Sequence, residues 1–161
     1  MQIDDYQQHD RQDVVWLFER FQDFLVDVDP LGRLQRPPGY GDAALQRTLK
    51  QVAEYNGVFY VAHDQGSVIG FIVAIVLPPI EVDDVGVIPA RRGRITELYV
   101  DTPYRRQGVG RLLMERAEAS LKERGCRYIR LEVFAPNTNA HDFYKRLGYQ
   151  NYDIDMMKRT D

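Results

Sequence analysis

Hydrophobic positions in the first third of the chain recur at the spacing of helices. Over residues 13–28 apolar side chains return every three or four positions and Pro30 follows, which predicts a helix that ends before this proline. A second helix is expected to begin at a cap on Asp42 and to end at Gly57. The stretch between the two helices is rich in proline and glycine and is therefore predicted to be a loop.

The pattern then becomes one of strands and helices in alternation. The predicted elements are a short first strand at 3–6, strands at 58–62 and 67–77 joined by a hairpin turn, a strand at 94–100, a helix at 108–124, a strand at 128–134, a helix at 137–147 and a last strand at 149–158. A strand–helix–strand order calls for a right-handed crossover between parallel strands, whereas the hairpin supplies antiparallel neighbours. We therefore expect an α/β (α+β) fold with a mixed, twisted sheet of about six to seven strands and helices on both faces.

Composition and charge exclude several classes of protein. A length of 161 residues favours a single domain over residues 1–161. The net charge of −3 provides no global attraction to nucleic acid or membrane, and the one cysteine, Cys126, excludes a disulfide framework and a multi-cysteine metal site. The N-terminus is polar, and the longest apolar run, residues 71–77, is far shorter than the roughly 20 residues of a membrane-spanning helix. We expect a soluble, cytoplasmic protein with no metal, no nucleic-acid partner and no membrane partner.

Candidate chemistry concentrates where the predicted strand at 94–100 leads into the next helix. The turn holds Arg105 and Arg106, the glycines Gly108 and Gly110 come next, and Arg111 follows. Glycine lets a ligand approach the backbone closely, and the first turn of a helix offers free N–H groups at a positive dipole end. These features predict a phosphate or pyrophosphate site, although an ordinary turn with surface arginines would have the same composition.

The glycines do not belong to either of the common nucleotide-binding loops. No Lys-Ser/Thr pair follows the second glycine, as it would in a nucleotide-hydrolysing P-loop. Leu113 stands where a dinucleotide-binding motif has its third glycine.

Two motifs instead resemble the GNAT superfamily of N-acetyltransferases. The pattern Arg105-x-x-Gly108-x-Gly110, after a strand that ends Leu98-Tyr99-Val100-Asp101, resembles the acetyl-CoA-binding motif of that family. The second match resembles the family's next strand and helix, and consists of Leu131-Glu132-Val133, Asn137, Ala140 and Phe143-Tyr144-Lys145-Arg146-Leu147-Gly148-Tyr149.

The resemblance implies how acetyl-CoA is held as the co-substrate. In this family a central pair of parallel strands splays apart, and the pantetheine arm pairs with backbone groups of the first strand. The residues onto which cofactor binding carries over are Leu98, Tyr99, Val100, Arg105, Arg106, Gln107, Gly108, Val109, Gly110, Arg111, Asn137, Ala140 and Tyr144. Asn137 is equally explained as a helix N-cap after Pro136, and one side chain can serve both purposes.

The resemblance also implies the reaction. The family's acceptor amine attacks the thioester directly while both substrates are bound, so no cysteine nucleophile is required, and Cys126 is interpreted as a small packed residue. Tyr144 matches the general acid that protonates the departing thiolate, and the alternative is a packed aromatic side chain. The amine must first lose a proton, which costs roughly 4.6 kcal/mol at pH 7 for a lysine-like amine but only about 1 kcal/mol for an α-amine.

Two glutamates compete for the role of general base. Glu132 stands five residues before Asn137, the spacing of the base in ribosomal-protein alanine acetyltransferases, and is slightly favoured. It could instead form an ion pair with Arg130 on the same strand face.

Glu97 is the second candidate base, because it adjoins Leu98 on the strand of the pantetheine contacts. Strand alternation predicts that it shares a face with Ile95 and Tyr99. Its alternative role is to satisfy a buried backbone group or Arg94.

The expected acceptor is a primary amine on a small molecule or a peptide, as an α-amine or a lysine. The family's acceptor groove maps onto the loops at 27–42 and 78–93, whose acidic residues would suit a cation but could equally be solvated loop charges. These residues are Asp27, Asp29, Glu81, Asp83 and Asp84. A homodimer, common among relatives, is compatible with the sequence.

Two other functions fit parts of the sequence. A CoA-binding sensor or interaction domain would keep the fold without turnover, but the retention of Tyr144 and both glutamates argues against it. A nucleic-acid binder would use the run at 91–94, which is short, has no aromatic neighbour and lies in an acidic chain. The histidines are weaker candidates, since His9 and His63 lie near element ends and His141 is interpreted as a solvated helix residue.

Overall fold

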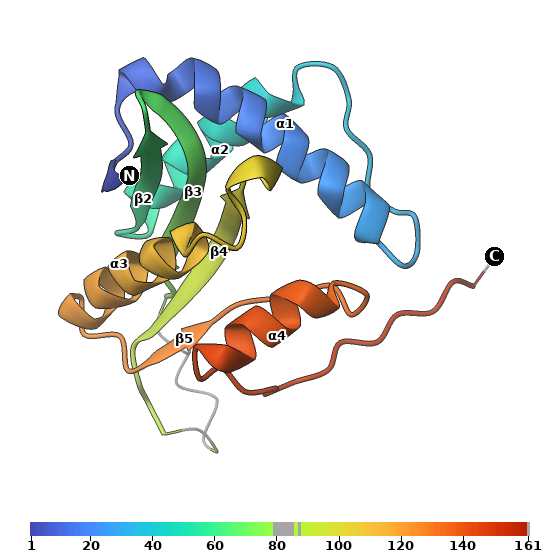
Figure 1. The fold of residues 1–161 in the computed structure, drawn as a ribbon. Coiled ribbons are helices and arrows are strands. Elements are labelled where there is room, and N and C mark those ends of the chain that lie inside the picture. Colours follow the sequence, from blue (N-terminus) through green and yellow to red (C-terminus); the bar gives the residue numbers. More distant parts are fainter. Residues whose placement is uncertain (79–85, 87, 161) are drawn as a thin grey trace.

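A mixed sheet organises the chain in the computed structural model, which describes residues 1–78, 86 and 88–160 (Figure 1). The elements are β1 (Gln2–Asp5), η1 (Gln8–Asp10), α1 (Arg11–Val28), α2 (Tyr40–Glu54), β2 (Val58–Asp64), β3 (Ser67–Val76), β4 (Arg92–Val100), η2 (Thr102–Tyr104), α3 (Val109–Glu123), β5 (Tyr128–Arg130) and α4 (Thr138–Arg146). The strands lie in the order β1-β2-β3-β4-β5, and neighbours are antiparallel except for the parallel pair β4 and β5. The expected fold class is therefore confirmed.

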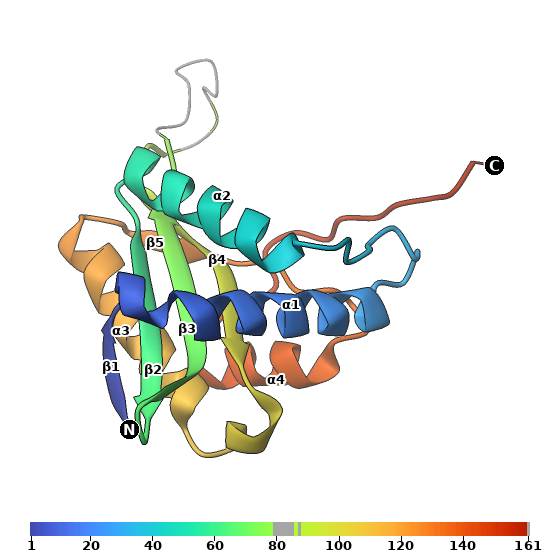
Figure 2. The same cartoon turned by 90° about the horizontal axis from the view of Figure 1, so that it is seen from above.

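Helices cover both faces of the sheet, as the sequence predicts. Helices α1 and α2 lie on one face, and α3 lies on the other with α4 on its side (Figure 2). The strand β3 is buried on both faces: the ring of Phe71 lies 4.5 Å from that of Phe18 in α1, while Ile72 joins the core under α3. Burial on two faces accounts for the continuous apolar run of this strand. Among the described residues, no helix is long and apolar enough to cross a membrane.

A β-bulge in β4 changes the face to which its side chains point. The pairing with β3 skips Thr96, which lies between Glu97 and Ile95. Because one extra residue reverses the alternation, Ile95 packs in the core under α3, whereas Tyr99 packs against α1 and Glu97 faces α2. The expectation that Glu97 shares a face with Ile95 was therefore wrong, and the expectation that it shares one with Tyr99 was correct.

The parallel strands β4 and β5 pair only at their beginnings. Residues 92–94 pair with residues 128–130, where β5 ends, whereas β4 continues to Val100. The strand expected at 128–134 is shorter for this reason, since its second half no longer follows β4. This separation is the splay that the resemblance implied, but within the described residues the pair lies at the edge of the sheet and not at its centre.

The last predicted strand, at 149–158, does not form. Residues 149–160 contain no helix or strand and extend away from the sheet in both views, with Tyr152 97% exposed (Figures 1 and 2). An alternating pattern forms a strand only where another strand offers its backbone groups, and no strand of the described part of the chain pairs with this segment. The described sheet therefore has five strands in place of the expected six to seven.

Candidate active site

The turn between β4 and α3 is anchored by the buried side chain of Asp101. Its carboxylate accepts hydrogen bonds from the amide of Thr102 (2.9 Å) and from Nε of Arg20 on α1 (3.0 Å). Farther along, Gly108 has a φ of 86° and caps the start of α3. No atom lies within 4 Å of a Cβ built on Gly108, so its left-handed backbone, and not a lack of space, requires glycine.

The first turn of α3 offers backbone donors to an anion. The amides of residues 109–111 precede Leu112, whose amide donates to the carbonyl of Gly108 (3.1 Å) as the first bond of the helix. A Cβ on Gly110 would come no closer than 3.5 Å to Phe143 of α4, which is an ordinary contact. Packing among the described residues therefore does not require glycine at position 110.

Arg105 is held against the end of β4. Its Nε donates to the carbonyl of Val100 (2.8 Å), and its guanidinium lies over the rings of Tyr99 (5.3 Å) and of Phe24 in α1 (5.4 Å). The contact fixes the direction of the side chain and keeps a positive charge beside the turn.

Three other polar side chains surround the turn. Arg106 is exposed and forms no ion pair with any described residue, Gln107 donates to the carbonyl of Pro103 (2.9 Å), and Arg111 pairs with Glu115 (2.7 Å). Exposed pairs of this kind exchange readily with solvent and ligands. The turn thus presents cations together with free amides, as an anion site requires.

The splayed half of β4 presents backbone groups away from β3. The amide of Asp101 donates to a carbonyl of β3 (2.9 Å). Because the bonds of an antiparallel ladder alternate, the backbone of Tyr99 also faces β3, whereas that of Leu98 and Val100 faces the side from which β5 has departed. The carbonyl of Val100 accepts the hydrogen bond from Arg105. No described strand pairs with the other outward-facing backbone groups of Leu98 and Val100.

Helix α4 carries the candidate residues of the second motif. Asn137 is its N-cap and accepts a hydrogen bond from the amide of Ala140 (3.2 Å). The ring of Tyr144 packs between those of Phe143 (5.2 Å) and Tyr149 (5.8 Å), and burial raises the pKa of Tyr144 to about 12. Its hydroxyl makes no hydrogen bond within the described part of the chain. Tyr144 is consequently a protonated phenol at neutral pH and can act as a proton donor.

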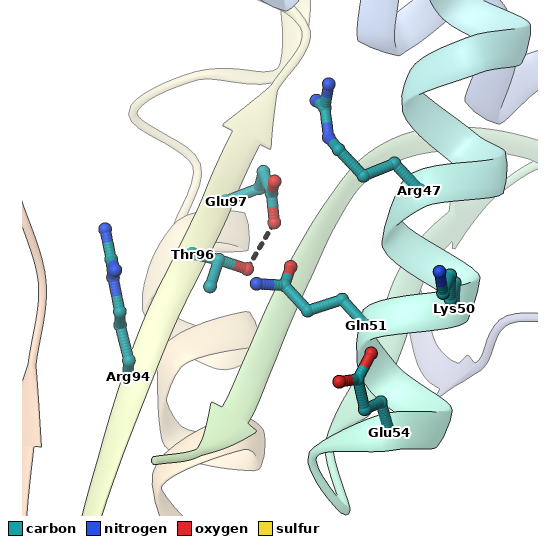
Figure 3. Close-up of a pocket in the computed structure, with 7 residues that line it drawn as sticks. All are labelled: Arg47, Lys50, Gln51, Glu54, Arg94, Thr96 and Glu97. Atoms are coloured by element: carbon teal, nitrogen blue, oxygen red, sulfur yellow. Dashed lines mark hydrogen bonds between the residues drawn. The ribbon is translucent and has the colours of Figure 1, made fainter. Parts of the chain in front are cut away.

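Glu97 lines a pocket between β4 and α2 (Figure 3). The pocket has a volume of about 380 Å³, and its other lining residues are Arg47, Lys50, Gln51, Glu54, Arg94 and Thr96. The hydroxyl of Thr96 donates to the carboxylate of Glu97, and in Figure 3 the side chains of Arg47 and Gln51 extend from α2 toward β4. Burial raises the pKa of Glu97, and the Thr96 hydrogen bond and the charge of Arg47 partly oppose this rise. Such a carboxylate has the surroundings of a general base.

Glu132 has different surroundings, because it follows the end of β5 and lies outside this pocket. Its side chain is 60% exposed and pairs with Arg94 (3.0 Å) and Arg130 (3.5 Å). The ion pair with Arg130 that the sequence suggested is therefore present, and Arg94 extends it. The structure does not bring the two glutamates into one site.

The acidic loop residues have separate roles where the structure describes them. The carboxylate of Asp29 accepts hydrogen bonds from the amides of Leu31 (3.0 Å) and Leu34 (2.8 Å), so it stabilises its own loop. Asp27 lies in the last turn of α1. It lines a second pocket, of about 230 Å³, together with Arg20 and other residues of α1 and with residues at the C-terminal end of β4. Glu81, Asp83 and Asp84 lie outside the described residues.

Sequence reasoning missed the wall that α2 contributes to the Glu97 pocket. Arg47, Lys50, Gln51 and Glu54 form this wall. The available signal was their spacing of three and four residues, which places them on one polar stripe beside the apolar stripe of α2. Such stripes are common on solvated helices, so the pattern alone does not indicate a site.

Comparison with known proteins identifies the family. The model of the acetyltransferase (GNAT) family matches residues 18–149. The chain is 30% identical over 138 residues to an N-alpha-acetyltransferase of Sulfurisphaera tokodaii, and the alignment covers 81% of this chain and 78% of that protein.

Solved structures share the fold. A tetramutant of a Bacillus halodurans protein is similar with a TM-score of 0.84, at 21% identity and over 99% of both chains. An aminoglycoside N-acetyltransferase in complex with CoA is similar with a TM-score of 0.75, at 16% identity and over 99% of this chain and 93% of that one. The family match covers most of the chain and includes β4, α3 and α4. The chain therefore belongs to the GNAT family, and it is an acyltransferase of the N-acetyltransferase type.

Proposed function

We propose that this N-acetyltransferase moves the acetyl group of acetyl-CoA to a primary amine by direct attack while both substrates are bound. The observation that carries the proposal is the arrangement around the splayed half of β4. A pocket with the half-buried carboxylate of Glu97 opens on the α2 side, Tyr144 packs on the α3 side, and the turn at 105–111 leads into α3. A proton acceptor and a proton donor thus flank one strand.

The residues around β4, α3 and α4 fit acetyl-CoA, which supplies an activated acetyl thioester when bound. The backbone groups of Leu98 and Val100 that face away from β3 would pair with the pantetheine arm. The turn at 105–111 would receive the pyrophosphate on free amides and arginine side chains. The glycine at 110 supports this fit, since neither packing among the described residues nor its backbone conformation calls for a glycine there.

Glu97 is the residue that we assign as general base. It would accept a proton from the acceptor ammonium, directly or through a water molecule, in the pocket between β4 and α2. Its raised pKa improves it as a base, because proton transfer is most efficient when the pKa of the base lies near the working pH. The exposure of Glu132 and its pairs with two arginines support an ion-pair role for that residue instead.

Tyr144 is the residue that we assign as general acid. It would donate the proton of its phenol to the departing thiolate of CoA. The raised pKa of about 12 keeps this proton in place until a strong acceptor forms. Burial also raises the pKa of the Cys126 thiol, which supports a mechanism without a cysteine nucleophile.

The acceptor is assigned as a primary amine, with an α-amine as the first choice. Similarity to an N-alpha-acetyltransferase supports this choice. An α-amine also costs only about 1 kcal/mol to deprotonate at pH 7, so a single carboxylate suffices as the base. The mixed charge of the pocket wall, from Arg47 and Lys50 to Glu54, does not favour a polycation.

The proposal is tested by the release of free CoA thiol from acetyl-CoA with a panel of amines. The panel contains peptides with a free α-amine, the same peptides with a blocked α-amine and one lysine, polyamines and an aminoglycoside. We expect saturable turnover with at least one class, highest for the free α-amine, and an acetylated product by mass spectrometry. Binding of acetyl-CoA without amine-dependent thiol release across the panel would contradict the proposal.

A further inference from the structure

A histidine–aspartate cluster lies outside the proposed acetyl-transfer site, where η1 meets the end of β2. It consists of His9, Asp10 and His63, with Asp4 of β1 beside it. Oδ1 of Asp10 lies 2.8 Å from Nε2 of His63 and 3.3 Å from Nε2 of His9. Nδ1 of His63 lies 3.3 Å from Oδ2 of Asp4. One donor atom each from His9, Asp10 and His63 lies within 4.8 Å of the other two.

The contacts of His63 call for a cation. Both of its ring nitrogens face carboxylate oxygens, which only accept hydrogen bonds, whereas a neutral imidazole has one N–H donor and one lone pair. If Nδ1 donates to Asp4, the lone pair of Nε2 points at Asp10. The side chain of Asp10 is only 1% exposed, so water does not screen this repulsion. A metal ion bound by both atoms removes it, as a second proton on the ring would.

We propose that His9, Asp10 and His63 bind a divalent transition-metal ion such as Zn²⁺, with water in the fourth position. Bonds of about 2.0–2.1 Å in a tetrahedral site separate the ligand atoms by roughly 3.4 Å. The separation between Asp10 and His9, 3.3 Å, is close to this value, whereas that between Asp10 and His63, 2.8 Å, is shorter and would have to lengthen on binding. Imidazole together with carboxylate suits zinc, copper and nickel better than magnesium or calcium.

Asp4 and Gln7 complete the site around the ligands. In carboxylate–histidine–zinc relays the ring donates one N–H to a carboxylate, and here a hydrogen bond from Nδ1 of His63 to Asp4 would set the tautomer in which Nε2 is free to bind a metal. The amide of Gln7 donates to Oδ2 of Asp10 (2.8 Å) and turns Oδ1 toward the histidines. The side chain of His9 is 77% exposed, which provides an entry path for the ion. A bound metal would tie η1 to β2.

The test is a titration of the tag-free protein with Zn²⁺ after treatment with a chelator and dialysis. Calorimetry at neutral pH is expected to give one zinc ion per chain, and zinc is expected to raise the Tm because it binds the folded state. Co²⁺ in place of Zn²⁺ is expected to give the intense visible absorption of a tetrahedral site. Absence of saturable zinc binding, or of this absorption, would overturn the proposal.

Variants locate the ion. We expect His9→Gln and His63→Gln each to lower zinc affinity by roughly tenfold or more, and Asp4→Asn to lower it on the order of tenfold to a hundredfold. If His63→Gln fails to fold, His9→Gln still provides the test. The side chain of His9 is exposed, so its replacement is not expected to disturb the fold. The control is His141→Gln, which changes the same residue type on α4, where its Nε2 contacts Asn151. Equal zinc affinity in wild type and His9→Gln, or an equal loss in His141→Gln, would exclude the site.

Discussion

Glu97 and Glu132 have the same carboxyl group but lie in different surroundings. The carboxylate of Glu97 lies in a pocket beside Thr96, and burial raises its pKa, whereas Glu132 is largely exposed between Arg94 and Arg130. Desolvation favours the neutral form of a carboxyl group, so proton affinity is higher in the pocket. At the scale of single residues, the protein has one glutamate suited to take a proton and one suited to pair with arginines.

Exchange of Glu97 for glutamine is expected to lower kcat/KM strongly at neutral pH. Loss of a general base typically costs a factor of about 10² to 10⁴. With a lysine-like acceptor much of the loss should return near pH 9 to 10, where solvent supplies the neutral amine, and with an α-amine the deficit should be smaller and flatter with pH. The measurement is the pH profile of kcat/KM. Glu132→Gln is the matched control, and a larger effect there than at Glu97 would contradict the assignment.

The same Glu97→Gln exchange is expected to raise the Tm at neutral pH. Because the folded-state pKa is raised, the folded protein retains a proton that the unfolded chain releases as the pH rises above the ordinary carboxyl range. The native glutamate therefore lowers the free energy of unfolding at every pH above the ordinary carboxyl range. In acid it has no such effect, because the carboxyl group is protonated in both the folded and the unfolded protein. Melting curves at neutral pH and near pH 3 check this expectation. A gain in Tm of the same size at both values would contradict the raised pKa.

Replacement of Tyr144 by phenylalanine is expected to slow acetyl transfer and to leave acetyl-CoA binding nearly unchanged. A lost general acid costs about 10² to 10⁴ in rate, and less if product release limits the wild type. Single-turnover rates measure the chemical step. The control is Tyr149→Phe, which removes a neighbouring hydroxyl that donates to Glu118 (2.8 Å). A Tyr144→Phe rate equal to wild type would assign this residue to packing alone.

At the scale of elements, the proposed function depends on how β4 departs from regular geometry. The bulge at Thr96 turns Glu97 toward α2, and the early end of β5 leaves one side of β4 unpaired. A bulge changes the direction of side chains and a splay exposes backbone groups, so the two irregularities produce the two halves of the proposed site. Helix α3 then begins beside the unpaired side with free amides.

A Gly110→Ala exchange probes the start of α3. Alanine is a better helix former than glycine by about 1 kcal/mol, and the new Cβ would meet Phe143 at an ordinary 3.5 Å, so the Tm is expected to stay the same or rise. The methyl group would occupy the room that we assign to the ligand, and acetyl-CoA affinity should fall roughly tenfold or more. Calorimetry of acetyl-CoA binding to the folded variant is the measurement. Unchanged affinity would place the ligand elsewhere.

At the scale of the whole molecule, α4 is the least buried of the helices around the site. None of its residues is fully buried, although its aromatic side chains pack partly against the core under α3. A ligand between β4 and α4 would touch both and hold the helix in place. The molecule thus combines a rigid sheet, closed by α1, α2 and α3, with a helix whose position acetyl-CoA can stabilise.

Saturation with acetyl-CoA is therefore expected to slow hydrogen exchange of the α4 amides and to raise the Tm of the whole protein, since the ligand binds the folded state. Hydrogen exchange followed by mass spectrometry provides the measurement. Peptides from β1 and β2 serve as the internal control, because these strands lie away from β4 in the sheet order. Protection confined to β1 and β2 would be inconsistent with the proposed cofactor site.

Local features of this protein were determined by the sequence alone. The helix periodicities, the left-handed glycine at 108 and the Asn137 cap depend on residues within about one helical turn, so their chemistry can be read without a partner. The strand–turn–helix motif at the end of β4 is equally local, and its resemblance to the GNAT family predicted the correct family. The order of helices and strands along the chain predicted the mixed sheet with helices on both faces.

Only the tertiary structure decided which residues meet. The bulge at Thr96 depends on pairing with β3 and leaves no trace in the alternation of the sequence, so the face of Glu97 relative to Ile95 could not be predicted. The length of β5 and the missing strand at 149–158 depend on whether a partner strand is present. The α2 wall of the Glu97 pocket and the cluster of His9, Asp10 and His63 join residues distant in sequence. Burial and approach between such residues are set by the packing of the whole chain, because desolvation and pairing act through space and not along the sequence.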